Sequence, residues 1–121
     1  MRRVDPFIAH LLELLSPIGE PTARRLFGGW GIYLDETMIG LVSEETFYLK
    51  TDESTRGAFE AAGSSPFVFE ARKRARTIVT GYWSVPEQAL DAAEAMLPWA
   101  QLALEAARRK AAATPKRRRL S

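Results

Sequence analysis

Three runs of strand-forming residues follow one another in the first half of the chain, separated only by pairs of acidic residues. The runs cover residues 30–34, 37–43 and 46–51, and the separating pairs are Asp35-Glu36 and Glu44-Glu45. Such short connections can join only antiparallel neighbours, because a parallel pair needs a crossover of a dozen or more residues. The sequence therefore predicts an antiparallel meander. Neither pair is the Asn-Gly or Asp-Gly that tight hairpins favour, so the strand registers stay open.

Helix-forming segments flank this meander. Asp5-Pro6 is typical of a helix start, and apolar residues at helical spacing continue to Ser16-Pro17, where a helix should end. A strand over residues 22–27, with Gly28-Gly29 as a bend, should come next. Later segments predict a helix over 52–62, a hairpin of strands over 67–70 and 77–83, a helical turn over 85–92, and a long helix from about 93 to 112. An antiparallel sheet, meander plus later hairpin, flanked by N-terminal and C-terminal helices is an α+β fold.

Composition limits the class of protein. The 121 residues, 46% of them hydrophobic, suit one domain with a real core, which we place at residues 1–112. With no cysteine, the chain has no disulfide, thiolate zinc site or cysteine nucleophile, and a reducing cytoplasm is the natural compartment. We expect no membrane segment and no signal peptide, because His10 and Glu13 interrupt the only early apolar run.

Charge is distributed unevenly. Residues 1–105 hold 10 of the 17 basic residues and all 15 acidic ones, so the body is mildly acidic and the basic pI belongs to the end of the chain. Residues 113–121 are expected to form a disordered basic tail. Two clusters could contact phosphates without sequence preference, or could simply be solvated. They are a hairpin tip of Arg72, Lys73, Arg74 and Arg76, and a tail of Lys116, Arg117, Arg118 and Arg119.

The segment around Trp30 holds the candidate partner-binding residues. Gly28-Gly29-Trp30-Gly31 resembles a phosphate loop, but no lysine is near and a strand follows it, so the glycines are expected to let Trp30 pack closely. Arg24 and Arg25 would point to opposite faces of a strand. One of them could bind an anion or an acidic partner, and an ion pair or a solvated edge is the alternative. Arg24, Arg25 and Trp30 are the candidates.

No residue pattern predicts catalysis, a metal site or a cofactor. The single histidine, His10, lies off the apolar stripe of its helix and has no second histidine for a metal. The acidic pairs occupy turns, and no serine lies in a Gly-x-Ser-x-Gly frame. The strand aromatics could be stacking platforms for single-stranded nucleic acid, although core packing is their usual role. Apolar residues on both faces of the meander require covering helices or a partner, and a homodimer is one way to cover them.

The segment from Ala23 to Leu34, ARRLFGGWGIYL, resembles the hallmark of the TfoX N-terminal domain family. Other patches that resemble the family agree in order and spacing: Thr46–Lys50, Phe59–Gly63 followed by Ser65–Phe67, Tyr82-Trp83 followed by Val85-Pro86, and Leu97–Ala100. Together the resemblance covers roughly residues 5–108 and implies a stand-alone domain of this family, with an antiparallel sheet flanked by helices. The family's namesakes are bacterial regulators of competence genes, regarded as coactivators beside the cyclic-AMP receptor protein, and they carry a second, helical domain.

Three functions follow as hypotheses. The first is a non-enzymatic, TfoX-like transcriptional regulator that acts through protein contacts, with weak DNA contact from the basic tail. The second is an adaptor or structural homodimer without a nucleic-acid role. The third is an enzyme with an unrecognised site, which the residues support least.

Overall fold

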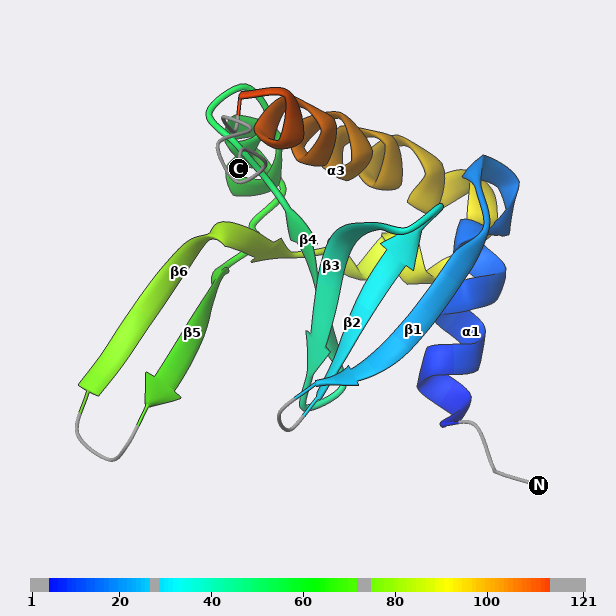
Figure 1. Cartoon of the computed structure of the whole chain (residues 1–121), viewed down its shortest axis with the longest axis horizontal. Coiled ribbons are helices and arrows are strands. Elements are labelled where there is room, and N and C mark those ends of the chain that lie inside the picture. Colours follow the sequence, from blue (N-terminus) through cyan, green and yellow to red (C-terminus); the bar gives the residue numbers. More distant parts are fainter. Residues whose placement is uncertain (1–4, 27–28, 72–74, 114–121) are drawn as a thin grey trace, which may run out of the picture.

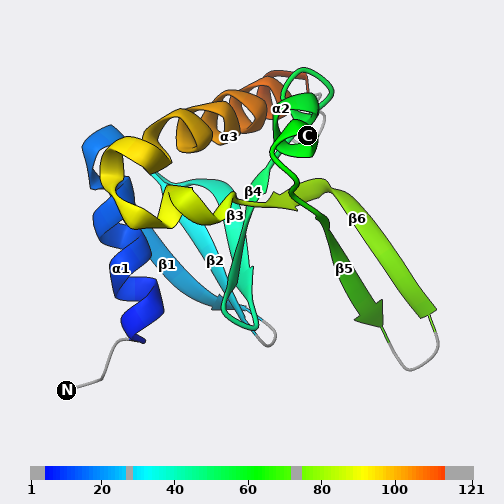
Figure 2. The same cartoon turned by 180° about the vertical axis from the view of Figure 1, so that it is seen from behind.

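The computed structural model describes residues 5–26, 29–71 and 75–113, and the side chains of residues 69–80 lie outside that description. Helices lie against one side of a six-stranded sheet (Figures 1 and 2). The strands are β1 (Pro21–Leu26), β2 (Gly29–Leu34), β3 (Thr37–Ser43), β4 (Thr46–Lys50), β5 (Pro66–Ala71) and β6 (Ala75–Ser84). The helices are α1 (Pro6–Leu15), α2 (Arg56–Ala61) and α3 (Ala93–Ala113), with short 3-10 turns η1 (Ser16–Ile18) and η2 (Glu87–Asp91).

The sheet has the strand order β1-β2-β3-β4-β6-β5, and every neighbouring pair is antiparallel. The predicted meander is therefore β1 to β4, and the later hairpin joins it through β6. Only three residue pairs connect β4 to β6, and the β5–β6 hairpin projects from the body (Figure 1). This arrangement confirms the predicted α+β fold.

Both short turns of the meander have the backbone that two-residue hairpins need. Asp35, Glu36, Glu44 and Glu45 all have positive φ angles, between 50° and 72°. Positive φ at both central residues matches the right-handed twist of the flanking strands, which is why such turns normally prefer asparagine and glycine. The registers left open by the sequence are Leu34 opposite Thr37 and Ser43 opposite Thr46.

The core lies between the helices and one face of the sheet. Fully buried sheet residues on this covered face are Ile32, Leu34, Ile39, Phe47 and Leu49. From α1, Ile8, Leu11 and Leu15 pack against them, and from α3, Met96, Ala100 and Ala103. The alanines let α3 approach the sheet closely, since they add little volume between the two layers.

Two helix predictions change at their boundaries. The helix expected over 52–62 begins only at Arg56, because Asp52 accepts hydrogen bonds from the backbone of Ser54 and Thr55 and holds them in a turn. Pro98 lies inside α3, and the helix continues through it. Its side chain is exposed, and its missing N–H costs the second turn of the helix one backbone hydrogen bond.

Candidate binding surface on the open sheet face

None of the helices that the structure describes lies over the sheet face that points away from α1 and α3 (Figures 1 and 2). Strand alternation and register place the side chains of Arg24, Leu26, Tyr33, Met38, Leu41, Tyr48, Lys50 and Tyr82 on this face, which we call the open face. All eight are half-buried or exposed. Within the described residues, none of its apolar or aromatic members belongs to the core. The helices therefore cover one apolar face and leave the other to solvent.

Gly31 lies at the centre of the apolar part of the open face. A Cβ atom added there would lie 3.0 Å from Leu26 Cδ1, 3.2 Å from Tyr33 Cε1 and 3.4 Å from Met38 Cε. These three side chains therefore lie around the glycine and form one continuous patch. Leu26 is 43% exposed, which is a large fraction for an apolar side chain packed beside others.

Two cations lie over aromatic rings on this face. The Arg24 guanidinium carbon is 4.5 Å from the centre of the Tyr33 ring, and the Lys50 ammonium is 4.7 Å from the centre of the Tyr82 ring. Both contacts are within the range of cation–π attraction. Next to Lys50 on β4, Tyr48 meets Phe67 of β5 edge-on with 5.0 Å between ring centres. The open face thus has Met38 and Leu41 on its middle strand β3, with a cation over a tyrosine ring on either side of them.

Arg25 and Trp30 lie on the covered side. Arg25 sits 5.0 Å above the Trp30 ring, and Trp30 packs against the core. The predicted opposite orientation of Arg24 and Arg25 is confirmed. The structure therefore separates the three sequence candidates: it groups Arg24 with Tyr33 and the open face, and it places Arg25 and Trp30 beside the core.

Most of the basic residues proposed for phosphate contact lie outside the described residues. These are Arg72, Lys73 and Arg74, together with Lys116, Arg117, Arg118 and Arg119. Arg76 belongs to β6, but its side chain is likewise outside the description. The basic residues at the end of α3 are exposed, and one of them makes a defined ion pair.

This ion pair connects α3 to the loop that follows β4. Arg109 donates to both carboxylate oxygens of Asp52, from Nε at 2.6 Å and from Nη2 at 3.1 Å. The hydrogen bond from Arg109 lowers the pKa of Asp52 below its usual value, with help from the backbone amides of Thr55 and Ser54. Asp52 thereby stays ionised and holds the C-terminal half of α3 against this loop.

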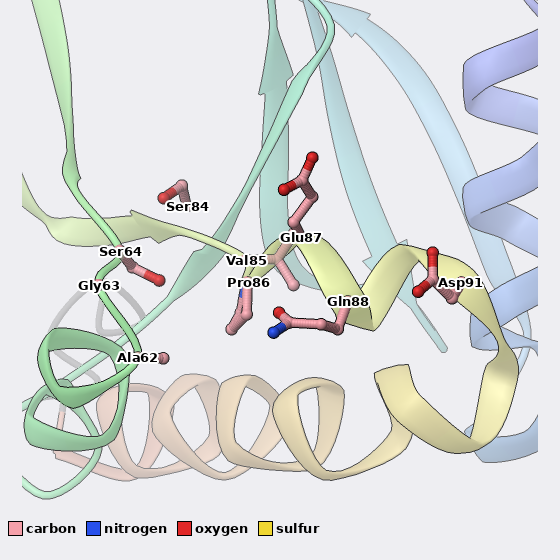
Figure 3. Close-up of a pocket in the computed structure, with 9 residues that line it drawn as sticks. All are labelled: Ala62, Gly63, Ser64, Ser84, Val85, Pro86, Glu87, Gln88 and Asp91. Carbon is pink, nitrogen blue, oxygen red and sulfur yellow. The ribbon is translucent and has the colours of Figure 1, made fainter.

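A pocket of about 570 Å³ lies between the end of α2, the end of β6 and η2 (Figure 3). Its polar lining includes Ser64, Ser84, Glu87, Gln88 and Asp91. The Ser64 hydroxyl has no hydrogen-bond partner, so no base is in place to activate it. The Ser84 hydroxyl accepts from the backbone N–H of Ser65, and the carboxylates of Glu87 and Asp91 lie apart along η2 (Figure 3). These groups do not converge on one point.

His10 has a structural contact that the sequence did not reveal. Its Nε2 lies 2.8 Å from the carbonyl oxygen of Leu90 and connects α1 to the segment before α3. Over residues 5–26, 29–71 and 75–113, no three histidine, cysteine or acidic side chains gather where they could hold a metal ion. No helix in those ranges has the length and apolar character needed to cross a membrane.

The sequence favours the core for its strand aromatics and leaves a stacking surface as the alternative. Core packing is right for Phe47 and Trp83, which are buried, whereas Tyr33, Tyr48 and Tyr82 are half-buried outside the core, and the sequence does not single out Lys50 beside them. The sequence carries a usable signal, namely which of the alternating positions of each strand are purely apolar. Ile32, Phe47 and Leu49 alternate with Tyr33, Tyr48 and Lys50, so the purely apolar side chains share one face and the amphipathic ones share the other.

The comparisons with known proteins agree with this architecture. The family model of the TfoX N-terminal domain matches residues 13–107, which is most of the 121 residues and includes all six strands. No curated protein matches the sequence. The match covers the whole sheet and most of α3, and the chain therefore belongs to the TfoX N-terminal domain family.

Proposed function

We propose that this protein is a non-enzymatic regulator of transcription that works by presenting the open face of its sheet to another macromolecule. Membership of the TfoX N-terminal domain family supports a competence-related regulatory role. Protein contacts carry the regulation, and the basic tail adds DNA contact without sequence preference.

The open face is the observation that carries this proposal. A continuous patch on which Leu26 is exposed and Met38 and Leu41 are half-buried is typical of an interaction site, since large contiguous apolar patches are rare on a monomer without a partner. The cations over Tyr33 and Tyr82 give the same surface a charge preference. Such a surface suits recognition of a partner better than it suits chemistry.

The distribution of reactive groups favours binding over catalysis. The acidic residues of the pocket lie apart, and Ser64 has no base beside it (Figure 3). A catalytic site would bring a nucleophile or a proton donor together with an orienting group.

A gene-replacement experiment tests the regulatory role. Deletion of the gene should change the level of a defined set of transcripts in the host, and the wild-type copy should restore them. A copy with Arg24→Gln should fail to restore them, whereas Arg25→Gln should succeed, because only the first changes the open face. Unchanged transcripts after deletion would remove the regulatory proposal.

The tail contact is tested separately with duplex DNA in a salt titration. The full chain should bind weakly and lose affinity steeply as salt rises, and a chain that ends at Ala113 should lose most of this binding. This end point keeps all of α3. Equal binding by both chains would place the DNA contact elsewhere.

An adaptor homodimer is the second candidate, favoured by Leu26 and Val68, which are 43% and 36% exposed. A dimer formed through the open face would bury both cations of each copy, so it requires acidic groups opposite them. Sedimentation of the wild type and of Leu26→Asp distinguishes the cases. A stable dimer that Leu26→Asp dissociates supports the adaptor, and a wild-type monomer removes it.

A further inference from the structure

Three tyrosines from three strands lie across the open face. Tyr33 comes from β2, Tyr48 from β4 and Tyr82 from β6, and all are half-buried outside the core. Leucine or isoleucine would supply apolar contact equally well. A tyrosine adds a flat ring that tolerates water, and this is the property that a stacking surface for unpaired bases needs.

The charged side chains that the structure describes on the open face have one sign. They are Arg24 and Lys50, and the side chains described there, which exclude those of residues 69–80, include no carboxylate. This contrasts with residues 1–105 as a whole, where acidic residues outnumber basic ones. A surface that gathers cations on an otherwise acidic body is complementary to an anionic ligand.

The acidic turns set the direction of that ligand. Asp35-Glu36 and Glu44-Glu45 connect successive strands and so lie at opposite ends of the meander. An anionic chain that ran along the strands would meet an acidic turn at each end of the meander, so it should run across the strands instead. The register aligns Arg24, Gly31, Leu41 and Tyr48 in one row across β1 to β4. At the usual strand spacing, this row is about 14 Å long, enough for a few nucleotides.

We propose that the open face binds single-stranded DNA, with bases stacked on the tyrosines and backbone phosphates beside Arg24 and Lys50. The proposal rests on the proposed function, in which the open face meets another macromolecule, and it names that macromolecule as DNA. The guanidinium over Tyr33 does not block the site, because bases also stack on arginine planes. The Lys50 contact with Tyr82 is weak at an exposed position. A base can therefore displace the ammonium toward its own phosphate.

Other ligands use only part of this surface. An acidic peptide would pair with the two cations but has no flat bases for Tyr48. An apolar protein surface would bury Arg24 and Lys50 without partners, which costs free energy. A DNA duplex hides its bases inside the helix, so it would contact the cations alone. Single-stranded DNA satisfies the rings and the charges together.

Fluorescence anisotropy of a labelled oligothymidylate with the full-length protein tests the site. The matched pair is Arg24→Gln and Arg25→Gln, which remove the same charge from adjacent residues on opposite faces of β1. We expect Arg24→Gln to weaken binding about ten-fold and to reduce the salt slope by about 0.7, the value for one phosphate contact on a single strand. Arg25→Gln should bind like the wild type, and the basic tail contributes equally to both.

A second pair tests stacking without a change of charge. Tyr48→Leu and Tyr33→Leu should each weaken binding about five-fold or more, because base–aromatic stacking is lost while apolar bulk stays. The melting temperature of each variant shows that it is folded. Should Arg24→Gln fail to fold, Lys50→Gln makes the same charge test from the other side of the face.

Several results would overturn the proposal. These are no binding of oligothymidylate, equal weakening by Arg24→Gln and Arg25→Gln, tighter binding of the matching duplex, and equal binding of poly-glutamate, which has charge but no bases. Tighter binding of oligouridylate would overturn the assignment to DNA. If oligothymidylate does not bind but the transcripts still respond to deletion and to Arg24→Gln, this inference fails while the regulatory role stands.

Discussion

The two faces of the sheet are built from neighbouring residues of the same strands, yet their aromatic side chains have different roles. Phe47 is fully buried against the helices, and the next residue, Tyr48, lies half-exposed on the open face. Trp83 and Tyr82 repeat this division on β6. In both of these pairs the ring without a hydroxyl completes the core, and the ring with one remains at water. The comparison teaches that strand aromatics have to be sorted by parity and polar atoms before they are assigned to a core.

The largest expected effect comes from the covered face. Phe47→Ala should destabilise the fold by about 3–5 kcal/mol, because it leaves a cavity among fully buried neighbours. Tyr48→Ala should cost only about 1 kcal/mol, mainly from its edge contact with Phe67. Urea denaturation of both variants measures the difference. Similar losses for the two would show that something covers the open face in solution.

A pair of glycines gives the next effect. A Cβ at Gly29 would overlap the backbone carbonyl oxygen of Val42, which cannot move without the strand, so Gly29→Ala should cost about 1–3 kcal/mol. At Gly31 the nearest atom is the flexible end of Leu26, so Gly31→Ala should cost less. Thermal melts of the two variants give the ranking. A reversed order would mean that the open-face patch is packed as rigidly as the backbone.

A substitution in a hairpin turn should raise the free energy of unfolding without changing either face of the sheet. Glu36 has a φ of 72°, a conformation that costs a residue with a side chain about 1–2 kcal/mol. Glycine avoids this cost but loses more freedom on folding, about 0.5–1 kcal/mol. Glu36→Gly should therefore be more stable by about 0.5–1 kcal/mol, as chemical denaturation can measure. A loss of stability would show that the Glu36 side chain makes a compensating contact.

The smallest effect concerns how the helical layer is held. Arg109 lowers the pKa of Asp52, so their pairing stabilises the fold above the usual pKa of a carboxyl group and is lost as pH falls through the lowered one. Arg109→Gln should be slightly less stable than the wild type at neutral pH. The two melting temperatures should begin to approach each other below about pH 4, where Asp52 of the unfolded chain takes up a proton, and should meet only below the lowered pKa of the paired carboxylate. A difference in melting temperature that stays constant across pH would assign the effect to packing.

Much of the architecture could be predicted from the sequence, because the two acidic pairs force an antiparallel meander and Asp5-Pro6 marks the first helix. β3 has the predicted bounds, Thr37–Ser43. The start of α2 could not be predicted, since Asp52 is a good helix cap that instead closes a local turn. The second apolar face of the meander was expected from the sequence, but the absence of a described helix over it could not be, because that depends on α1 and α3 packing on the same side of the sheet.

The first strand also has a consequence for solubility. β1 is the outermost strand of the meander, so one row of its backbone groups has no neighbouring strand and could recruit another chain. Pro21 at its start removes one donor from the backbone, and Arg24 and Arg25 place one positive charge on each face of the strand. A second copy that added itself to this edge would bring like charges near one another on both faces of the joined sheet. Coulomb repulsion therefore opposes the addition of another chain at this border of the sheet.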